Sequence, residues 1–298
     1  MSAREESITW RNPARLLPAD AVSAESLRCA VNAACAGEHT AAIEAARWPA
    51  YLRERGVDLG LSMLLQRAND ILAFALLTPR PHQRTRIALF GTVPSQRFRG
   101  FAARLLDEVL AGANARRENS VELEVVAQNH PAMKACWARG FKPLARLYGF
   151  SHASDQPGRA ARVAGEGADD PMVTSVSAPE ALEWLHDLDT LDPQELPWPV
   201  SAAALPQRRS VQAWRCERAQ LVFETVAGVK LRVWSLVDRD PEQRGAAQLL
   251  ATLRAQYPHA MLKTLPVYRQ DGAARAFEAM GWRRQAHYQW WLQWALCG

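Results

Sequence analysis

Apolar residues recur in the first half of the chain at the spacings of helices and strands. Leu106, Val109, Leu110 and Ala113 follow three- and four-residue steps, which predicts an amphipathic helix over residues 101–113. Short apolar runs beside turn residues predict strands. The expected order is helices over 23–36 and 40–55, strands over 61–66, 71–78 and 86–93, the helix over 101–113, a strand over 121–127, a helix over 131–139 and a strand over 142–150.

The second half predicts a similar order of strands and helices. Its expected elements are a strand over 172–176, a helix over 179–188, strands over 211–217, 221–226 and 229–237, a helix over 246–256, a strand over 261–265, a helix over 273–280 and a strand over 287–294. Between the halves, residues 151–170 are small, polar and rich in glycine, which is typical of a linker. The sequence therefore predicts a tandem α/β protein, with domains over 1–150 and 171–298.

Composition narrows the class of protein. Hydrophobic residues make up 48% and charged residues 22% of the 298 positions, which is globular composition. No run approaches the roughly 18–20 apolar residues of a membrane helix, and no signal-peptide core begins the chain, so a soluble cytoplasmic protein is expected. The net charge of +5 suits an anionic cofactor, but the arginines are spread along the chain, so nucleic acid is not an expected partner.

Cysteine usage points away from metals and disulfides. The five cysteines are scattered, and none forms a CxxC pair, so neither a zinc site nor a disulfide framework is expected. They are Cys29, Cys35, Cys136, Cys216 and Cys297.

A candidate anion site lies between the strand over 86–93 and the helix over 101–113. The first turn of a helix presents unpaired N–H groups and the positive end of the helix dipole. Gly100 allows a phosphate to approach the backbone, and the small Ala102 keeps the next amide accessible. The alternative is that both are small residues needed where a helix packs on a sheet.

Two motifs in this half resemble the GNAT superfamily of acetyl-CoA-dependent N-acetyltransferases. The first is Arg97-x-x-Gly100-x-Ala102, and the second is Asn129-x-x-Ala132-x-x-x-Cys136-x-x-x-Gly140-Phe141. They occur in the family's order, with a helix and a strand between them. The resemblance covers residues 61–150 well and the first 60 residues loosely. It implies a mixed α/β acyltransferase fold and acetyl-CoA (CoA) as cofactor.

The resemblance also implies which residues hold the cofactor. Backbone amides from Arg97 to Ala102 would bind the pyrophosphate, the strand near 91–93 would pair with the pantetheine arm, and Asn129 would contact that arm or shape the cleft. The implied cofactor-binding residues are Thr92, Val93, Arg97, Phe98, Arg99, Gly100, Phe101, Ala102 and Asn129.

The reaction of this family needs a base for the amine and benefits from an acid for the departing thiolate. Glu122 and Glu124 share one face of a predicted strand and are candidate bases; they are equally candidates for a solvated face or for partners of nearby arginines. His130 is a further candidate base. Cys136 occupies the position where the family often has a tyrosine that acts as the general acid. It is either a proton donor or a thiol packed in the core. Tyr148 is the next candidate acid, or else an edge aromatic.

The second half resembles a degenerate copy of the same GNAT domain. Gln270-x-x-Ala273-x-x-x-Phe277-x-x-x-Gly281-Trp282 repeats the second motif, with no ionisable group at Phe277. In the first motif, Ala247 and Leu249 replace the glycine and the small residue, which predicts loss of cofactor binding. An alternative register makes Gly245 the glycine of the loop.

These observations predict an N-acetyltransferase that transfers an acetyl group from acetyl-CoA to a primary amine of a small molecule or peptide, by direct attack in a ternary complex. Two alternatives stay open: a non-catalytic acyl-CoA-binding sensor or scaffold, and an enzyme that uses a longer acyl chain. A homodimer is compatible with the sequence, which leaves the oligomeric state open.

Overall fold

The computed structural model describes residues 13–36, 42–153, 172–191, 196–207, 211–226 and 230–296. The chain divides into two compact units. Unit 1 comprises Met1–Glu124, His130–Lys142 and Leu292–Gly298, and unit 2 comprises Val125–Asn129 and Pro143–Trp291. This division differs from the expected one at residue 150. The chain enters unit 2 before that residue and contributes its C-terminal end to unit 1.

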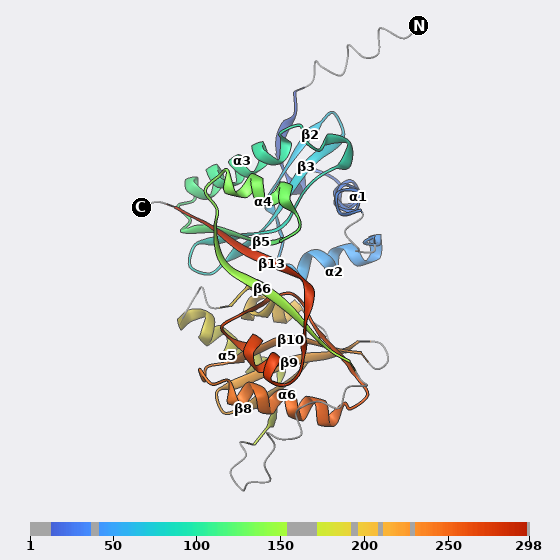
Figure 1. Cartoon of the computed structure of the whole chain (residues 1–298). Coiled ribbons are helices and arrows are strands. Elements are labelled where there is room, and N and C mark those ends of the chain that lie inside the picture. Colours follow the sequence, from blue (N-terminus) through green and yellow to red (C-terminus); the bar gives the residue numbers. More distant parts are fainter. Residues whose placement is uncertain are drawn as a thin grey trace. The chain divides into compact units, whose positions relative to one another are not determined.

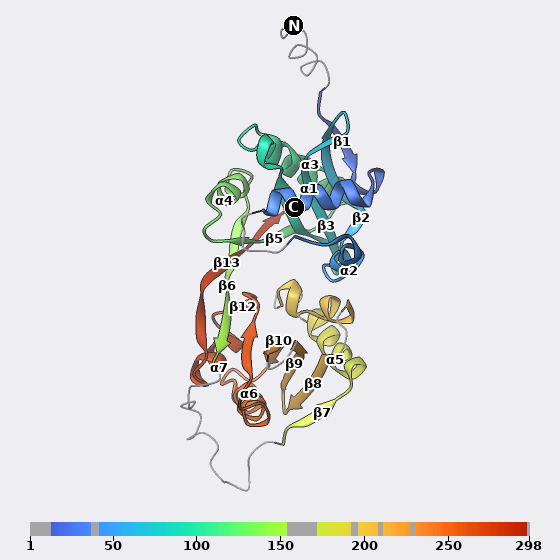
Figure 2. The same ribbon diagram turned by 90° about the vertical axis from the view of Figure 1, so that its right-hand side faces the viewer.

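Unit 1 is a mixed sheet with helices on both faces (Figures 1 and 2). Its elements are β1 (Arg15–Pro18), α1 (Ala24–Cys35), α2 (Trp48–Arg53), β2 (Asp58–Arg67), β3 (Asp70–Arg80), β4 (Arg84–Thr92), α3 (Phe101–Ala115), β5 (Ser120–Val126), which ends in unit 2, and α4 (His130–Trp137), with short 3-10 turns at Ala19–Ala21, Ala45–Arg47 and Pro94–Gln96. The strand order is β1-β2-β3-β4-β5, and only β4 and β5 pair in parallel.

The two faces of this sheet are covered by different helices. On one face, α1 buries Leu27, Val31 and Ala34 in a cluster with strand residues such as Phe74, and α2 adds Trp48. On the other face, α3 buries Leu105, Leu106, Val109 and Ala113, the apolar stripe of an amphipathic helix. The sheet is completed at β5 by the end of β13 (Arg283–Ala295), where Gln293 Nε2 donates to Ser120 Oγ at 3.2 Å.

Unit 2 repeats the α/β pattern. Its elements are β6 (Lys142–His152), β7 (Thr174–Val176), α5 (Ala178–Leu191), β8 (Val211–Cys216), β9 (Ala219–Val226), β10 (Lys230–Asp238), α6 (Arg244–Gln256), β11 (Met261–Thr264), β12 (Tyr268–Arg269), α7 (Ala273–Ala279) and most of β13, with 3-10 turns at Trp198–Val200 and Ala202–Gln207. The strand order is β7-β8-β9-β10-β11-β6-β13, in which β10 and β11 pair in parallel.

The structure differs from the sequence prediction in two segments, residues 40–55 and residues 151–153. The helix expected over 40–55 is a 3-10 turn at Ala45–Arg47 followed by the short α2, because Pro49 lacks an N–H and fits only the first turn of a helix. Residues 37–41 lie outside the described residues. The expected linker 151–170 also lies outside them beyond residue 153, and β6 extends through His152.

In the described ranges, no helix combines the length and the apolar character that crossing a bilayer requires.

Candidate functional site

The loop that joins β4 to α3 is built around a left-handed glycine. After β4, Val93 N donates to Leu72 O at 3.0 Å, and Gln96 N closes a 3-10 turn onto Val93 O at 2.9 Å. Gly100 then precedes the first residue of α3 with φ +81°, and a Cβ built on it meets no atom within 4 Å. A glycine is favoured by this backbone conformation, and the space in front of it is open.

Backbone amides lie beside this open space at the start of α3. The first helical hydrogen bond runs from Arg104 N to Gly100 O at 3.0 Å. Among the described residues, no acceptor is bonded to the amides of Arg99, Gly100, Phe101 and Ala102. These donors, together with the positive end of the α3 dipole, make a site suited to a phosphate or diphosphate.

Arg97 has a different role from its neighbours. Its amide donates to Pro94 O at 3.3 Å, and its Nη2 donates to Ala34 O, at the end of α1, at 2.8 Å. The Arg97 side chain therefore ties the loop to the end of α1. The amides without an acceptor belong to the residues that follow Arg97. Sequence reasoning did not find this contact, because it joins residues 63 positions apart.

Over the second part of β4, the edge next to the loop has no strand partner in the part of the chain that the structure describes. The recorded register with β5 covers Arg84↔Ser120 to Arg86↔Glu122 and ends there. On the β3 side, Leu76 pairs with Leu89 and Leu77 with Ile87, so Ala88 is an extra residue and the strand bulges. An open strand edge can take up an extended ligand through main-chain hydrogen bonds. Thr92 lies at the end of this edge, just before the loop.

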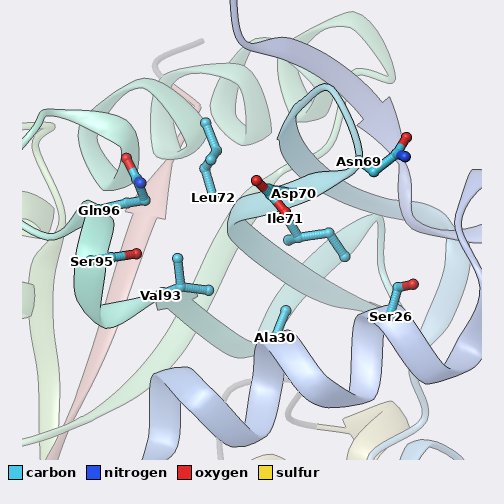
Figure 3. A pocket seen from close by; sticks show the side chains of 9 residues that line it. All are labelled: Ser26, Ala30, Asn69, Asp70, Ile71, Leu72, Val93, Ser95 and Gln96. Atoms are coloured by element: carbon cyan, nitrogen blue, oxygen red, sulfur yellow. The ribbon is translucent and has the colours of Figure 1, made fainter. Parts of the chain in front are cut away.

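A cavity of about 450 Å³ lies beside the same loop, on the side of α1 (Figure 3). It is lined by Ser26, Ala30, Asn69, Asp70, Ile71, Leu72, Val93, Ser95 and Gln96. Its single ionisable side chain is the carboxylate of Asp70, which repels a phosphate. The cavity is therefore the less suitable place for a diphosphate, and the start of α3 is the better one.

Glu122 and Glu124 are both held by arginines. Arg80 Nη1 lies 2.9 Å from Glu122 Oε1, and both side chains are 1% exposed. Arg84 Nη1 lies 3.9 Å from the same oxygen. Arg86 holds Glu124 with two atoms, Nε at 2.9 Å and Nη2 at 2.7 Å from Oε2. The structure thus places both candidate bases in buried ion pairs within the sheet of unit 1.

The two candidate acids are enclosed by packing. Cys136, on α4, is fully buried, and burial raises the pKa of its thiol to about 11. Tyr148, on β6 in unit 2, is 9% exposed. The guanidinium carbon of Arg284 lies 4.4 Å from the centre of the Tyr148 ring, and Tyr288 lies beside it at 5.7 Å. These are the surroundings of a core residue in each case.

Asn129 and His130 lie at the start of α4. Asn129 N donates to Val126 O at 2.9 Å, which closes the turn after β5, and its side chain is half-buried. His130 is exposed at the first position of the helix. Their roles toward a ligand stay predictions.

In unit 2, the helix start that corresponds to α3 is filled by the protein itself. Ala246 N donates to Asp238 Oδ2 at 2.8 Å, so a carboxylate from the end of β10 takes the place of an external anion. A Cβ on Gly245 would lie 2.8 Å from both Ala219 Cβ and Cys216 O, so this glycine is packed against protein. The register with Gly245 as the loop glycine does not restore an open site. The sequence signal for this closure, an aspartate at the end of the strand, went unnoticed.

Comparisons with known proteins agree with the motifs. Residues 32–141 match the model of the acetyltransferase (GNAT) family. No curated protein matches the sequence.

Solved structures share the fold over nearly the whole chain. A GCN5-related N-acetyltransferase from Kribbella flavida has 17% identity and a TM-score of 0.63, over 97% of this chain and 72% of the other. A second, from Sphaerobacter thermophilus, has 15% identity and a TM-score of 0.59, over 96% and 94%. A tandem GNAT protein from the clavulanic acid biosynthesis pathway has 12% identity and a TM-score of 0.59, over 95% and 98%.

The predicted fold class is confirmed: residues 32–141 match the model of the acetyltransferase (GNAT) family, and the chain has the fold of a tandem GNAT protein.

Proposed function

We propose that the chain is an N-acetyltransferase in which unit 1 binds acetyl-CoA and passes its acetyl group to a primary amine. One observation carries the proposal: four consecutive amides at the start of α3, from Arg99 to Ala102, are unbonded and open to an anion. Each charge-assisted hydrogen bond to such an anion contributes on the order of 1.5–3 kcal/mol, so several together hold a diphosphate firmly. The family match over the same residues supports this assignment.

The unpaired edge of β4 supplies the second half of the binding site. Its N–H and C=O groups after the Ala88 bulge are suited to the amide-containing pantetheine arm. Acetyl-CoA would supply a thioester. As the amine nitrogen bonds to its carbonyl carbon, the C–S bond would break, CoA would leave as a thiolate, and the amine would lose a proton. A β4 N–H next to that carbonyl would stabilise the oxyanion that forms, and this contribution is commonly the largest in acyl transfer.

The arginine pairs of Glu122 and Glu124 argue against a role as general base. Both carboxylates are buried against guanidinium groups, which occupy the oxygens that a base would present to the amine. We expect these residues to join β3, β4 and β5 instead. Cys136 is fully buried, which separates its thiol from a departing thiolate and argues against a role as the acid. We therefore propose that water entering the cleft accepts the proton of the amine.

The proposal is tested with acetyl-CoA and primary amines of graded size: alkylamines, amino sugars and lysine-containing peptides. A reagent that reacts with the free thiol of CoA should report faster CoA release with the protein than without it, for at least one class of amine. Mass spectrometry should find the amine heavier by about 42 Da, the mass of an acetyl group that replaces a hydrogen. Binding of acetyl-CoA without release for any amine would point to the non-catalytic sensor. Absence of binding would contradict the proposal itself.

A further inference from the structure

Phe98 is exposed to an unusual extent for an aromatic residue. Its relative exposure is 94%, the highest among the large hydrophobic residues that the structure describes, ahead of Met172 at 77% and Leu191 at 67%. No described aromatic ring or guanidinium packs on it. The ring is therefore accessible to a ligand that binds at this loop.

The backbone of Phe98 is also strained. Its φ is +62°, in the left-handed region that glycine, asparagine and aspartate tolerate and that a bulky side chain rarely adopts. Strain of this kind persists where the surrounding structure imposes it, and such residues cluster at ligand sites. Here Arg97, bonded to Ala34 O, fixes the chain immediately before Phe98.

The position of Phe98 relates the ring to the anion site. It lies directly before the amides of Arg99 to Ala102, on the loop that Gly100 ends. A ligand whose diphosphate binds those amides brings the group attached to the diphosphate to the same loop. In CoA this group, at the end opposite the pantetheine arm, is an adenosine, and its base offers a flat aromatic face.

We propose that the Phe98 ring is a stacking platform for the adenine of the coenzyme. The inference rests on the proposed function and gives the Phe98 side chain a specific role in it. Stacking of a base on an aromatic side chain is sequence-tolerant and substantial, and alanine substitution of such a residue typically weakens binding about tenfold. The ring thereby gains in the complex the contact that it lacks in the free protein.

The test compares ligands with and without the base. Calorimetry is run on the wild type, Phe98→Ala, Phe98→Gly and Phe98→Trp with CoA, dephospho-CoA and 4′-phosphopantetheine, which has no adenosine. We expect Phe98→Ala and Phe98→Gly to bind CoA and dephospho-CoA about tenfold more weakly, and phosphopantetheine as the wild type does. Phe98→Trp should keep the wild-type affinities.

Stability separates lost stacking from a damaged loop. Glycine relieves the left-handed strain, so Phe98→Gly should melt no lower than Phe98→Ala while binding CoA equally weakly. Affinity for CoA within twofold of the wild type in both variants would overturn the stacking proposal and leave the proposed function standing. An equal loss for phosphopantetheine would overturn it too. Failure of the wild type to bind any of the three ligands would overturn both.

Discussion

Acetyl-CoA should bind the Gly100→Asp variant about 100-fold more weakly than the wild type. The new carboxylate would project into the open space before α3, since a Cβ at this position meets no protein atom within 4 Å. It would repel the diphosphate and compete for the amides of Arg99 to Ala102, as Asp238 occupies the start of α6. Isothermal titration calorimetry measures the change in affinity.

A second glycine provides a matched control. Gly281, in unit 2, also has a left-handed φ, +78°, and its Cβ would likewise meet nothing within 4 Å. Gly281→Asp therefore introduces the same charge at a similar backbone cost, about 1–2 kcal/mol, away from the proposed site. It should bind acetyl-CoA as the wild type does. Equal affinity of Gly100→Asp and the wild type would contradict the assignment of this loop.

Glu122→Gln should lower the free energy of unfolding by about 3–5 kcal/mol. The substitution removes the negative charge that Arg80 contacts at 2.9 Å, and Arg84 also lies near it. Both buried guanidinium groups would then lose the carboxylate that they contact, which is the costly way to break an ion pair. Chemical denaturation followed by tryptophan fluorescence measures the loss, and a two-state transition is the condition for converting it to a free energy.

An exposed pair gives the corresponding control. Glu25 pairs with Arg28 on the surface of α1, with its side chain 61% exposed, so Glu25→Gln should leave the unfolding midpoint unchanged. A Glu122→Gln protein as stable as the wild type, but with a strongly lowered kcat, would show that Glu122 is the base after all.

Local sequence was sufficient for the helix and loop that form the proposed site. The spacing of apolar residues placed α3 within two residues of its observed end, and Gly100 lies directly before the helix, as expected. Both features depend on residues that are close in the chain. By contrast, the four-residue β1 escaped prediction, because it is stabilised by pairing with β2, at Arg15↔Gln66 and onward.

Contacts distant in sequence explain what was missed at the site. Glu122 and Glu124 were placed correctly on one strand face, but their arginine partners depend on the register of β3, β4 and β5. The burial of Cys136 depends on how α4 packs in the folded unit, which a motif position does not reveal. Asp238 is eight residues from the amide that it caps.

Hydrogen–deuterium exchange with saturating acetyl-CoA tests the central claim most directly. If the amides at the start of α3 hold the diphosphate, exchange should slow in peptides covering residues 97–104. It should stay unchanged over 240–247, where Asp238 already occupies the start of α6. Unchanged exchange over 97–104 while the protein binds acetyl-CoA, or protection over 240–247 instead, would contradict the account.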